Sequence, residues 1–334
     1  MLDLGVQYPI IQAPMAGITT PELAAAVSNA GRLGALGLGA LNAEQARAQI
    51  TRTAELTDRP FGVNLFCHRA AGRDAAREAA WLDRLAPHFA RYGAAVPDAL
   101  SPDYISLRDD DAMLRVIVET RPRVISFHFG LPRADQLEAL CATGAVLLAS
   151  AVNLEDAQEI ARAGLDGIVA QGWQAGGHRG MFDENGPDAR LEVLDLLAEL
   201  RPVGLPLIAA GGIMTAGDVR AALDAGAVAA QCGTAFLVAD EAATTAPHRA
   251  GLAAGETMMT RAISGRPARG LANHIAQIDP EGAPDYPLPY SATKALNRAA
   301  LDADETGYGP FWAGTGCAQA QPGPAAEILA RLVP

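Results

Sequence analysis

Short apolar runs alternate with longer amphipathic stretches from the N-terminus to Phe236. The apolar runs are continuous and rich in β-branched residues, as in parallel strands that are buried on both faces. The longer stretches place apolar residues three or four positions apart and therefore predict helices. We expect strands at residues 10–13, 33–38, 60–65, 124–129, 145–150, 165–170, 207–210 and 229–232.

The helix after the first strand shows how helix ends are predicted. Thr20 is a suitable N-cap, Pro21 fits the first turn, and Gly31 ends the helix. Further helices are expected at residues 42–55, 74–92, 109–120, 133–143, 154–163, 188–200 and 216–225. Strands and helices that alternate eight times in this order predict an α/β fold, a (β/α)8 TIM barrel with a parallel sheet.

The alternation ends after Phe236. We expect a helix at residues 244–259, followed by irregular segments rich in proline, glycine and aromatic residues. The sequence therefore predicts a barrel domain (1–244), a smaller α+β cap or substrate domain over the barrel mouth (245–324), and a terminal helix that returns to the barrel (325–334). Long loops over a barrel mouth are more often functional than idle.

A glycine-rich loop with a single histidine follows the sixth predicted strand, in the segment GLDGIVAQGWQAGGHRG. Gln171 lies where this strand leaves the core, and its amide can both donate to and accept from the polar edge of a ring. His178 is the only side chain here that titrates near neutral pH, and the adjacent cation Arg179 favours the neutral imidazole that a base requires. The alternative is a solvated surface loop whose histidine has no function.

Two more glycine-containing loops, AAGGI and QCGTAF, follow the seventh and eighth predicted strands. In TIM barrels the active site lies at the carboxyl ends of the strands, and these two loops commonly bind phosphate. Gly211, Gly212, Gly233 and Thr234 therefore predict a phosphate site whose donors are backbone N–H groups and one hydroxyl. The alternative is that the glycines only allow tight turns.

Composition and charge narrow the class of protein. A net charge of -12 and a pI near 4.9, with no basic run, argue against a nucleic-acid partner or a membrane surface. We find neither a signal peptide nor an apolar run of about 18 residues, so we expect a cytoplasmic protein. The four cysteines are scattered and the six histidines form no helical pair, which favours reduced thiols and no metal site.

The chain resembles the nitronate monooxygenase family, formerly called 2-nitropropane dioxygenases, and its bacterial class I members in particular. The resemblance covers almost the whole chain and is carried by six segments in order: APMAGITTPELAAAVSNAG, DRPFGVNLF, AQGWQAGGHRG, AAGGI, QCGTAF and SGRPARGLAN. It implies a flavoprotein that binds FMN across the mouth of a TIM barrel, with His178 as the catalytic residue. It implies FMN contacts by Met15, Asn64, Gln171, Gly176, Gly177, Gly212, Gly233 and Thr234.

The resemblance also implies a substrate pocket formed by Tyr104, Tyr286, Tyr290 and Lys294. Tyrosine rings restrict the volume beside a flavin, and hydroxyl and ammonium groups donate to the oxygen atoms of a small anion. The alternative is that these side chains only pack the cap.

Two positions depart from the family pattern. Arg32 replaces an expected glycine, which concerns only a helix end, and Gln174 replaces a frequent glutamate. Since the second change removes a carboxylate near His178, we expect a lower histidine pKa than in relatives.

The reaction implied by the resemblance is oxidative denitrification. An alkyl nitronate such as propionate 3-nitronate passes electrons to FMN, and reaction with O2 leads to a carbonyl product and nitrite. His178 then deprotonates a neutral nitroalkane or, as imidazolium, holds the nitronate charge. The alternatives are an NADH:quinone reductase or an enoyl-thioester reductase on the same barrel, and a flavin-binding module without catalysis. Whether the chain forms a homodimer is left open.

Overall fold

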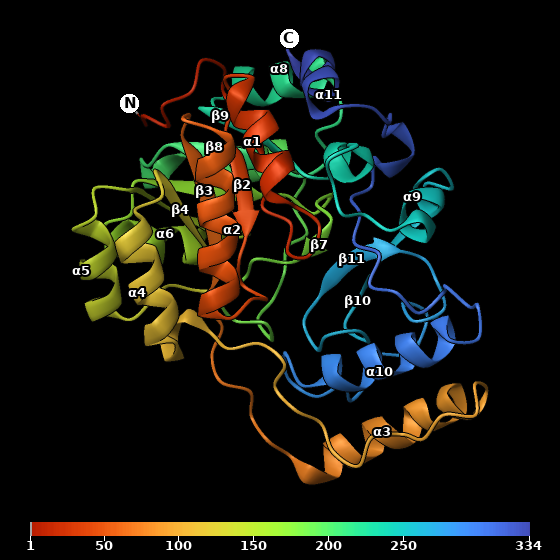
Figure 1. Cartoon of the computed structure of the whole chain (residues 1–334). Coiled ribbons are helices and arrows are strands. Elements are labelled where there is room, and N and C mark those ends of the chain that lie inside the picture. The colour runs from red at the N-terminus through yellow and green to blue at the C-terminus, as the bar shows by residue number, and fades with distance from the viewer. Residues whose placement is uncertain (1) are drawn as a thin grey trace.

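The computed structural model describes residues 2–334 and is built around a closed parallel barrel (Figure 1). Eight strands form it in the order β1-β9-β8-β6-β5-β4-β3-β2, and a bridge between Ile11 and Leu33 joins the two ends. The predicted (β/α)8 architecture is therefore confirmed. The barrel strands are β1 (Ile10–Gln12), β2 (Gly34–Gly37), β3 (Phe61–Phe66), β4 (Val124–His128), β5 (Val146–Ala151), β6 (Gly167–Gln171), β8 (Leu207–Ala210) and β9 (Ala229–Cys232).

The helices that cover the outside of the barrel bury their apolar faces against it (Figure 1). The helix that follows β1 has the expected N-cap, because the Thr20 hydroxyl accepts from the N–H of Leu23 at 3.0 Å. These helices are α1 (Pro21–Asn29), α2 (Ala43–Leu56), α4 (Asp111–Thr120), α5 (Ala134–Cys141), α6 (Leu154–Arg162), α7 (Val193–Leu200), α8 (Ala216–Asp224) and α11 (Ala325–Leu332).

The start of α7 differs from the prediction of a helix from residue 188. Residues 188–192 are not helical, because Asp188 forms an ion pair with Arg179 in the preceding loop. The helix begins only at Val193.

The segment after the barrel contains two strands whose positions the sequence analysis did not predict. The expected helix at residues 244–259 is wrong: α9 (Ala246–Leu252) is short, Gly255 adopts a φ of +73°, and β10 (Thr257–Thr260) follows. β10 pairs with β11 (Ala268–Leu271), which also pairs with the two-residue strand β7 (Gly177–His178). Pairing with distant residues therefore decides the conformation of this segment.

A second hydrophobic cluster lies beside the barrel, where α3 (Ala75–Ala90) runs along α10 (Pro289–Leu301) (Figure 1). Trp81 of α3 and Leu296 of α10 are both buried in it. We assigned α3 to the barrel domain from the sequence, but its apolar face packs against the cap. The terminal helix α11 buries Ile328 and Leu329 in the hydrophobic cluster between the barrel sheet and its outer helices, beside α1 and α8.

Three further observations concern residues 2–334. None of their helices has the length and apolar content that crossing a bilayer requires. All four cysteines are free thiols. No cluster of three or more histidine, cysteine, aspartate or glutamate side chains in this part of the chain is arranged to hold a metal ion.

Candidate functional site

A cavity of about 710 Å³ opens at the carboxyl ends of the barrel strands, between the barrel and the cap. It brings together all of the side chains and glycines that the sequence analysis selected. They are Met15, Asn64, Tyr104, Gln171, Gly176, Gly177, His178, Gly211, Gly212, Gly233, Thr234, Tyr286, Tyr290 and Lys294. Their individual roles stay predictions.

The backbone of His178 is fixed from two sides. Its strand β7 pairs with Ala268 of β11, and its carbonyl oxygen accepts from Gln171 Nε2 at 2.8 Å and from His128 Nε2 at 3.2 Å. Gln171 Oε1 also accepts from the N–H of Gly180 at 2.8 Å. The Gln171 amide, which we expected to bind the polar edge of a ring, therefore makes most of its hydrogen bonds within the loop. It has one N–H left for a ligand.

The side chain of His178 lies in an aromatic enclosure. The ring centroids of Phe129, Tyr286 and Trp312 are 5.5, 5.5 and 5.1 Å from that of His178. Burial lowers the pKa of His178 well below its ordinary value of 6.5, and the nearby His128 and the permanent cation Arg266 lower it further. The imidazole is therefore neutral at physiological pH, as a base must be.

Arg179 does not act on His178 as we expected. Its guanidinium, which is 1% exposed, pairs with both oxygens of Asp188 at 2.8 and 3.0 Å and donates to the carbonyls of Gln171 and Gly172. Arg179 therefore ties the glycine-rich loop to the end of β6, and the cation that lowers the His178 pKa is Arg266 instead.

The two departures from the family pattern make contacts with residues other than His178. Gln174 Oε1 accepts from the N–H of Val193 at 3.0 Å, at the start of α7, whose N-cap residue makes no side-chain bond. In this chain burial is the main cause of the low His178 pKa, and the comparison with relatives that carry glutamate at position 174 stays a prediction. Arg32 lies 4.1 Å from the ring centre of Tyr8, after the end of α1.

The loops after β8 and β9 form a cradle without charged side chains. Gly211 and Gly212 have φ values of +112° and +74°, which favour glycine. No hydrogen bond within residues 2–334 uses the N–H groups of Gly212 and Gly233. The Thr234 hydroxyl accepts from the N–H of Gly314 at 2.9 Å, which leaves its own proton for a ligand. These donors fit a flavin phosphate.

The cavity also has open space for a planar ring beside Gly177. A Cβ atom on Gly177, where φ is +76°, would meet no atom within 4 Å, so the backbone borders open space. Met15 and Asn64 also line the cavity, on segments that follow β1 and form β3. The unpaired N–H groups, the Thr234 hydroxyl and the open wall therefore fit a flavin nucleotide.

The cap side of the cavity carries the polar groups expected for an anionic substrate. Burial raises the pKa of Tyr286 and Tyr290 well above 10, so both hydroxyls keep their protons and can donate. Lys294 Nζ lies 4.3 Å from the Tyr104 ring centre and 2.8 Å from Asp103 Oδ2. Burial lowers the Lys294 pKa, but hydrogen bonds to Asp103 and Tyr104 raise it on balance. The ammonium group therefore stays charged.

The residues at the site that were not predicted include Asp103, His128, Ser264 and Trp312. His128 ends the fourth strand, and that position at the barrel mouth was a usable signal. Burial lowers its pKa to about 4. Since its Nε2 donates to a carbonyl, its Nδ1 accepts from the Ser150 hydroxyl at 2.8 Å.

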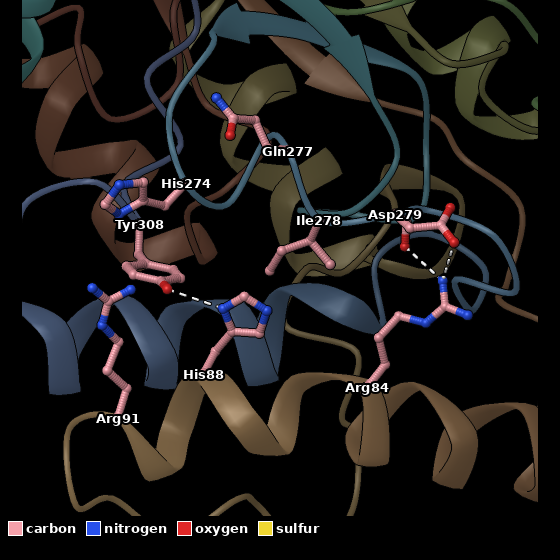
Figure 2. A pocket seen from close by; sticks show the side chains of 8 residues that line it. All are labelled: Arg84, His88, Arg91, His274, Gln277, Ile278, Asp279 and Tyr308. Carbon is pink, nitrogen blue, oxygen red and sulfur yellow. Dashed lines mark hydrogen bonds and ion pairs between the residues drawn. The ribbon is translucent and has the colours of Figure 1, made fainter.

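A second cavity of about 580 Å³ lies between α3 and the segment before α10 (Figure 2). Its polar groups largely bind one another: Arg84 pairs with Asp279 at 2.8 Å, and His88 Nδ1 lies 3.0 Å from the Tyr308 hydroxyl. It is remote from the barrel strand ends, so we place the chemistry in the first cavity.

Comparison with known proteins agrees with this geometry. The family profile described as nitronate monooxygenase matches residues 1–334. Nitronate monooxygenase of Paraburkholderia phytofirmans is 52% identical over 338 residues, covering 98% of this chain and 92% of that protein. The enzyme of the same name from Pseudomonas aeruginosa is 48% identical, covering 99% and 96%.

A solved structure is also similar. Nitroalkane oxidase from Streptomyces ansochromogenes superposes with a TM-score of 0.90 at 38% identity, over 99% of this chain and 95% of that one. Full-length sequence similarity and the barrel with its cavity thus point the same way, and the chain belongs to the nitronate monooxygenase family.

Proposed function

We propose that this protein is an FMN-dependent nitronate monooxygenase that converts alkyl nitronates and O2 to carbonyl compounds and nitrite. The observation that carries the proposal is the neutral, enclosed His178 in the same cavity as the glycine cradle and the cap tyrosines. Family membership supports a flavin-dependent reaction with a nitronate substrate.

The protein's part in this reaction is to bind, orient and move a proton. FMN, when bound, supplies the electron-accepting ring and the redox chemistry. The donors near Thr234 hold the phosphate, while Tyr286, Tyr290 and Lys294 donate to the nitronate oxygens or to an anionic tail. His178 accepts a proton from a neutral nitroalkane and thereby forms the nitronate in place.

Replacing Thr234 with valine is expected to weaken FMN binding by about 10- to 100-fold. The substitution removes a neutral donor to a charged phosphate and leaves the Gly314 N–H without its acceptor. Flavin fluorescence titration of the apoprotein measures the dissociation constant. Thr234→Ser keeps the hydroxyl and is the matched control; equal affinity of the valine variant and wild type would place the phosphate elsewhere.

The function itself is tested by anaerobic absorption spectra of the purified protein. Propionate 3-nitronate should bleach the bound flavin, and nitrite should appear once air is admitted. NADH, added in a separate cuvette, should leave the flavin oxidised. Reduction by NADH alone would assign the protein to the flavin reductases, and a protein that binds no FMN would rule out both reactions.

A further inference from the structure

The ring of His178 makes its hydrogen bond with a residue from the cap. Nε2 lies 2.9 Å from Oγ of Ser264, a side chain that is 1% exposed in the connection between β10 and β11. The pairing of β11 with β7 brings the two residues together. Among residues 2–334, none hydrogen-bonds Nδ1, and the imidazole lines the cavity, so Nδ1 is the nitrogen left for a ligand.

The surroundings of Ser264 decide which way its hydroxyl points. Oγ lies 3.2 Å from the carbonyl oxygen of Arg266 and 3.3 Å from its N–H. A carbonyl only accepts, and no other donor in the described part of the chain reaches this one. Because Arg266 is 2% exposed, leaving its carbonyl unpaired would be unfavourable. The hydroxyl proton therefore goes to Arg266, and Oγ is free to accept.

We propose that Ser264 is a positioning residue that holds neutral His178 with its proton on Nε2, so that Nδ1 presents its lone pair to the cavity as the proton acceptor. The hydrogen bonds then run in one direction, from Nε2–H to Ser264 Oγ and from Oγ–H to the Arg266 carbonyl. A fixed tautomer matters because only the unprotonated ring nitrogen can act as a base.

The proton transfer that this geometry serves rests on the proposed function. The α-carbon–hydrogen bond of a nitroalkane breaks, its electron pair forms the carbon–nitrogen double bond of the nitronate, and the proton bonds to Nδ1. The ring becomes an imidazolium, and the bond from Nε2–H to Ser264 becomes charge-assisted and stronger. Ser264 therefore orients the base and stabilises its protonated form without touching the substrate.

The tautomer can be read directly by NMR. We expect two-bond ¹H–¹⁵N correlation of ¹⁵N-histidine-labelled holoprotein to show a protonated, pyrrole-type Nε2 and an unprotonated, pyridine-type Nδ1 for His178. A His178→Asn sample assigns the signals. The reverse pattern in the wild type would overturn the proposal. This measurement needs no turnover, so its result does not depend on whether the protein has nitronate monooxygenase activity.

Kinetics test the positioning role. Ser264→Ala should lower kcat/KM for a neutral nitroalkane by about 10- to 100-fold, the range seen when the hydrogen-bond partner that orients a metal-binding imidazole is removed. It should change kcat/KM for preformed nitronate little, and Ser264→Thr should recover part of the loss. In a His178→Asn background the alanine substitution should cost nothing more, because Ser264 acts through His178. If kcat/KM fell equally with both substrates, or fell further in the His178→Asn background, Ser264 would contribute only to packing.

Discussion

Replacing His178 with asparagine is expected to reduce kcat/KM for a neutral nitroalkane by about 10²- to 10⁴-fold, the usual contribution of a positioned base. Asparagine is close in size and can still donate to Ser264, but it cannot accept a proton. Turnover of preformed nitronate should fall much less, because its α-proton is already gone. Flavin content should not change, since the phosphate cradle near Thr234 involves other residues.

The pH dependence offers a second check on the same residue. The His178 pKa lies well below 6.5, so the ring stays neutral as the pH falls from 8 through 6.5. In the wild type, protonation of His178 should therefore not decrease kcat/KM for the nitroalkane between pH 8 and pH 6.5. Any decrease caused by that protonation should occur only at a lower pH.

Steady-state assays of both substrates across pH, with nitrite release as the signal, measure these effects. His274→Asn replaces a half-exposed histidine that does not line the first cavity; it is the matched control and should behave as the wild type. If His178→Asn and the wild type turned over both substrates equally, His178 would have no part in the mechanism.

Replacing Arg179 with methionine is expected to lower the free energy of unfolding by about 3–5 kcal/mol, the usual cost of breaking a buried ion pair from one side. Arg179 is 1% exposed and satisfies Asp188 as well as two carbonyl oxygens at the end of β6. Its loss leaves a partly buried carboxylate without its cation. The loop that carries His178 should loosen, so activity should fall as well.

Urea denaturation followed by circular dichroism measures the change in stability. Arg179 and the exposed Arg190 both lie beside the ring of Trp173, at 5.5 and 5.1 Å. Arg190→Met is therefore the control and should change the free energy of unfolding by less than about 1 kcal/mol. In Arg179→Met/Asp188→Asn, part of the loss should return because no unpaired charge remains. If Arg179→Met were as stable as the control, the ion pair between Arg179 and Asp188 would not stabilise the fold.

The parts of the fold that follow from local pattern were predictable. Each barrel strand is an apolar run between polar helices, so the spacing of apolar residues alone indicates β8 and β9 with the bounds that the structure has. The position of a residue at a strand end also places it at the barrel mouth, which is why Gln171, Gly212 and Thr234 meet in one cavity.

Contacts between distant segments were not predictable in this way. Thr257–Thr260 forms a strand because Ala268–Leu271 offers it hydrogen bonds, although the same residues had suggested a helix. α3 lies near the barrel in sequence but buries Trp81 against the cap. Periodicity records which face of a helix is apolar and carries no information about which surface covers that face.

The electrostatics of the site depend most strongly on tertiary structure. The sequence places Arg179 next to His178, yet the folded chain pairs Arg179 with Asp188 and brings Arg266 and Ser264 to the imidazole from the cap. Coulombic and hydrogen-bond energies depend on distance in space and on burial, neither of which follows from adjacency in the chain. The sequence therefore predicted that His178 is neutral, and the tertiary structure supplied the physical reason: burial within the aromatic enclosure.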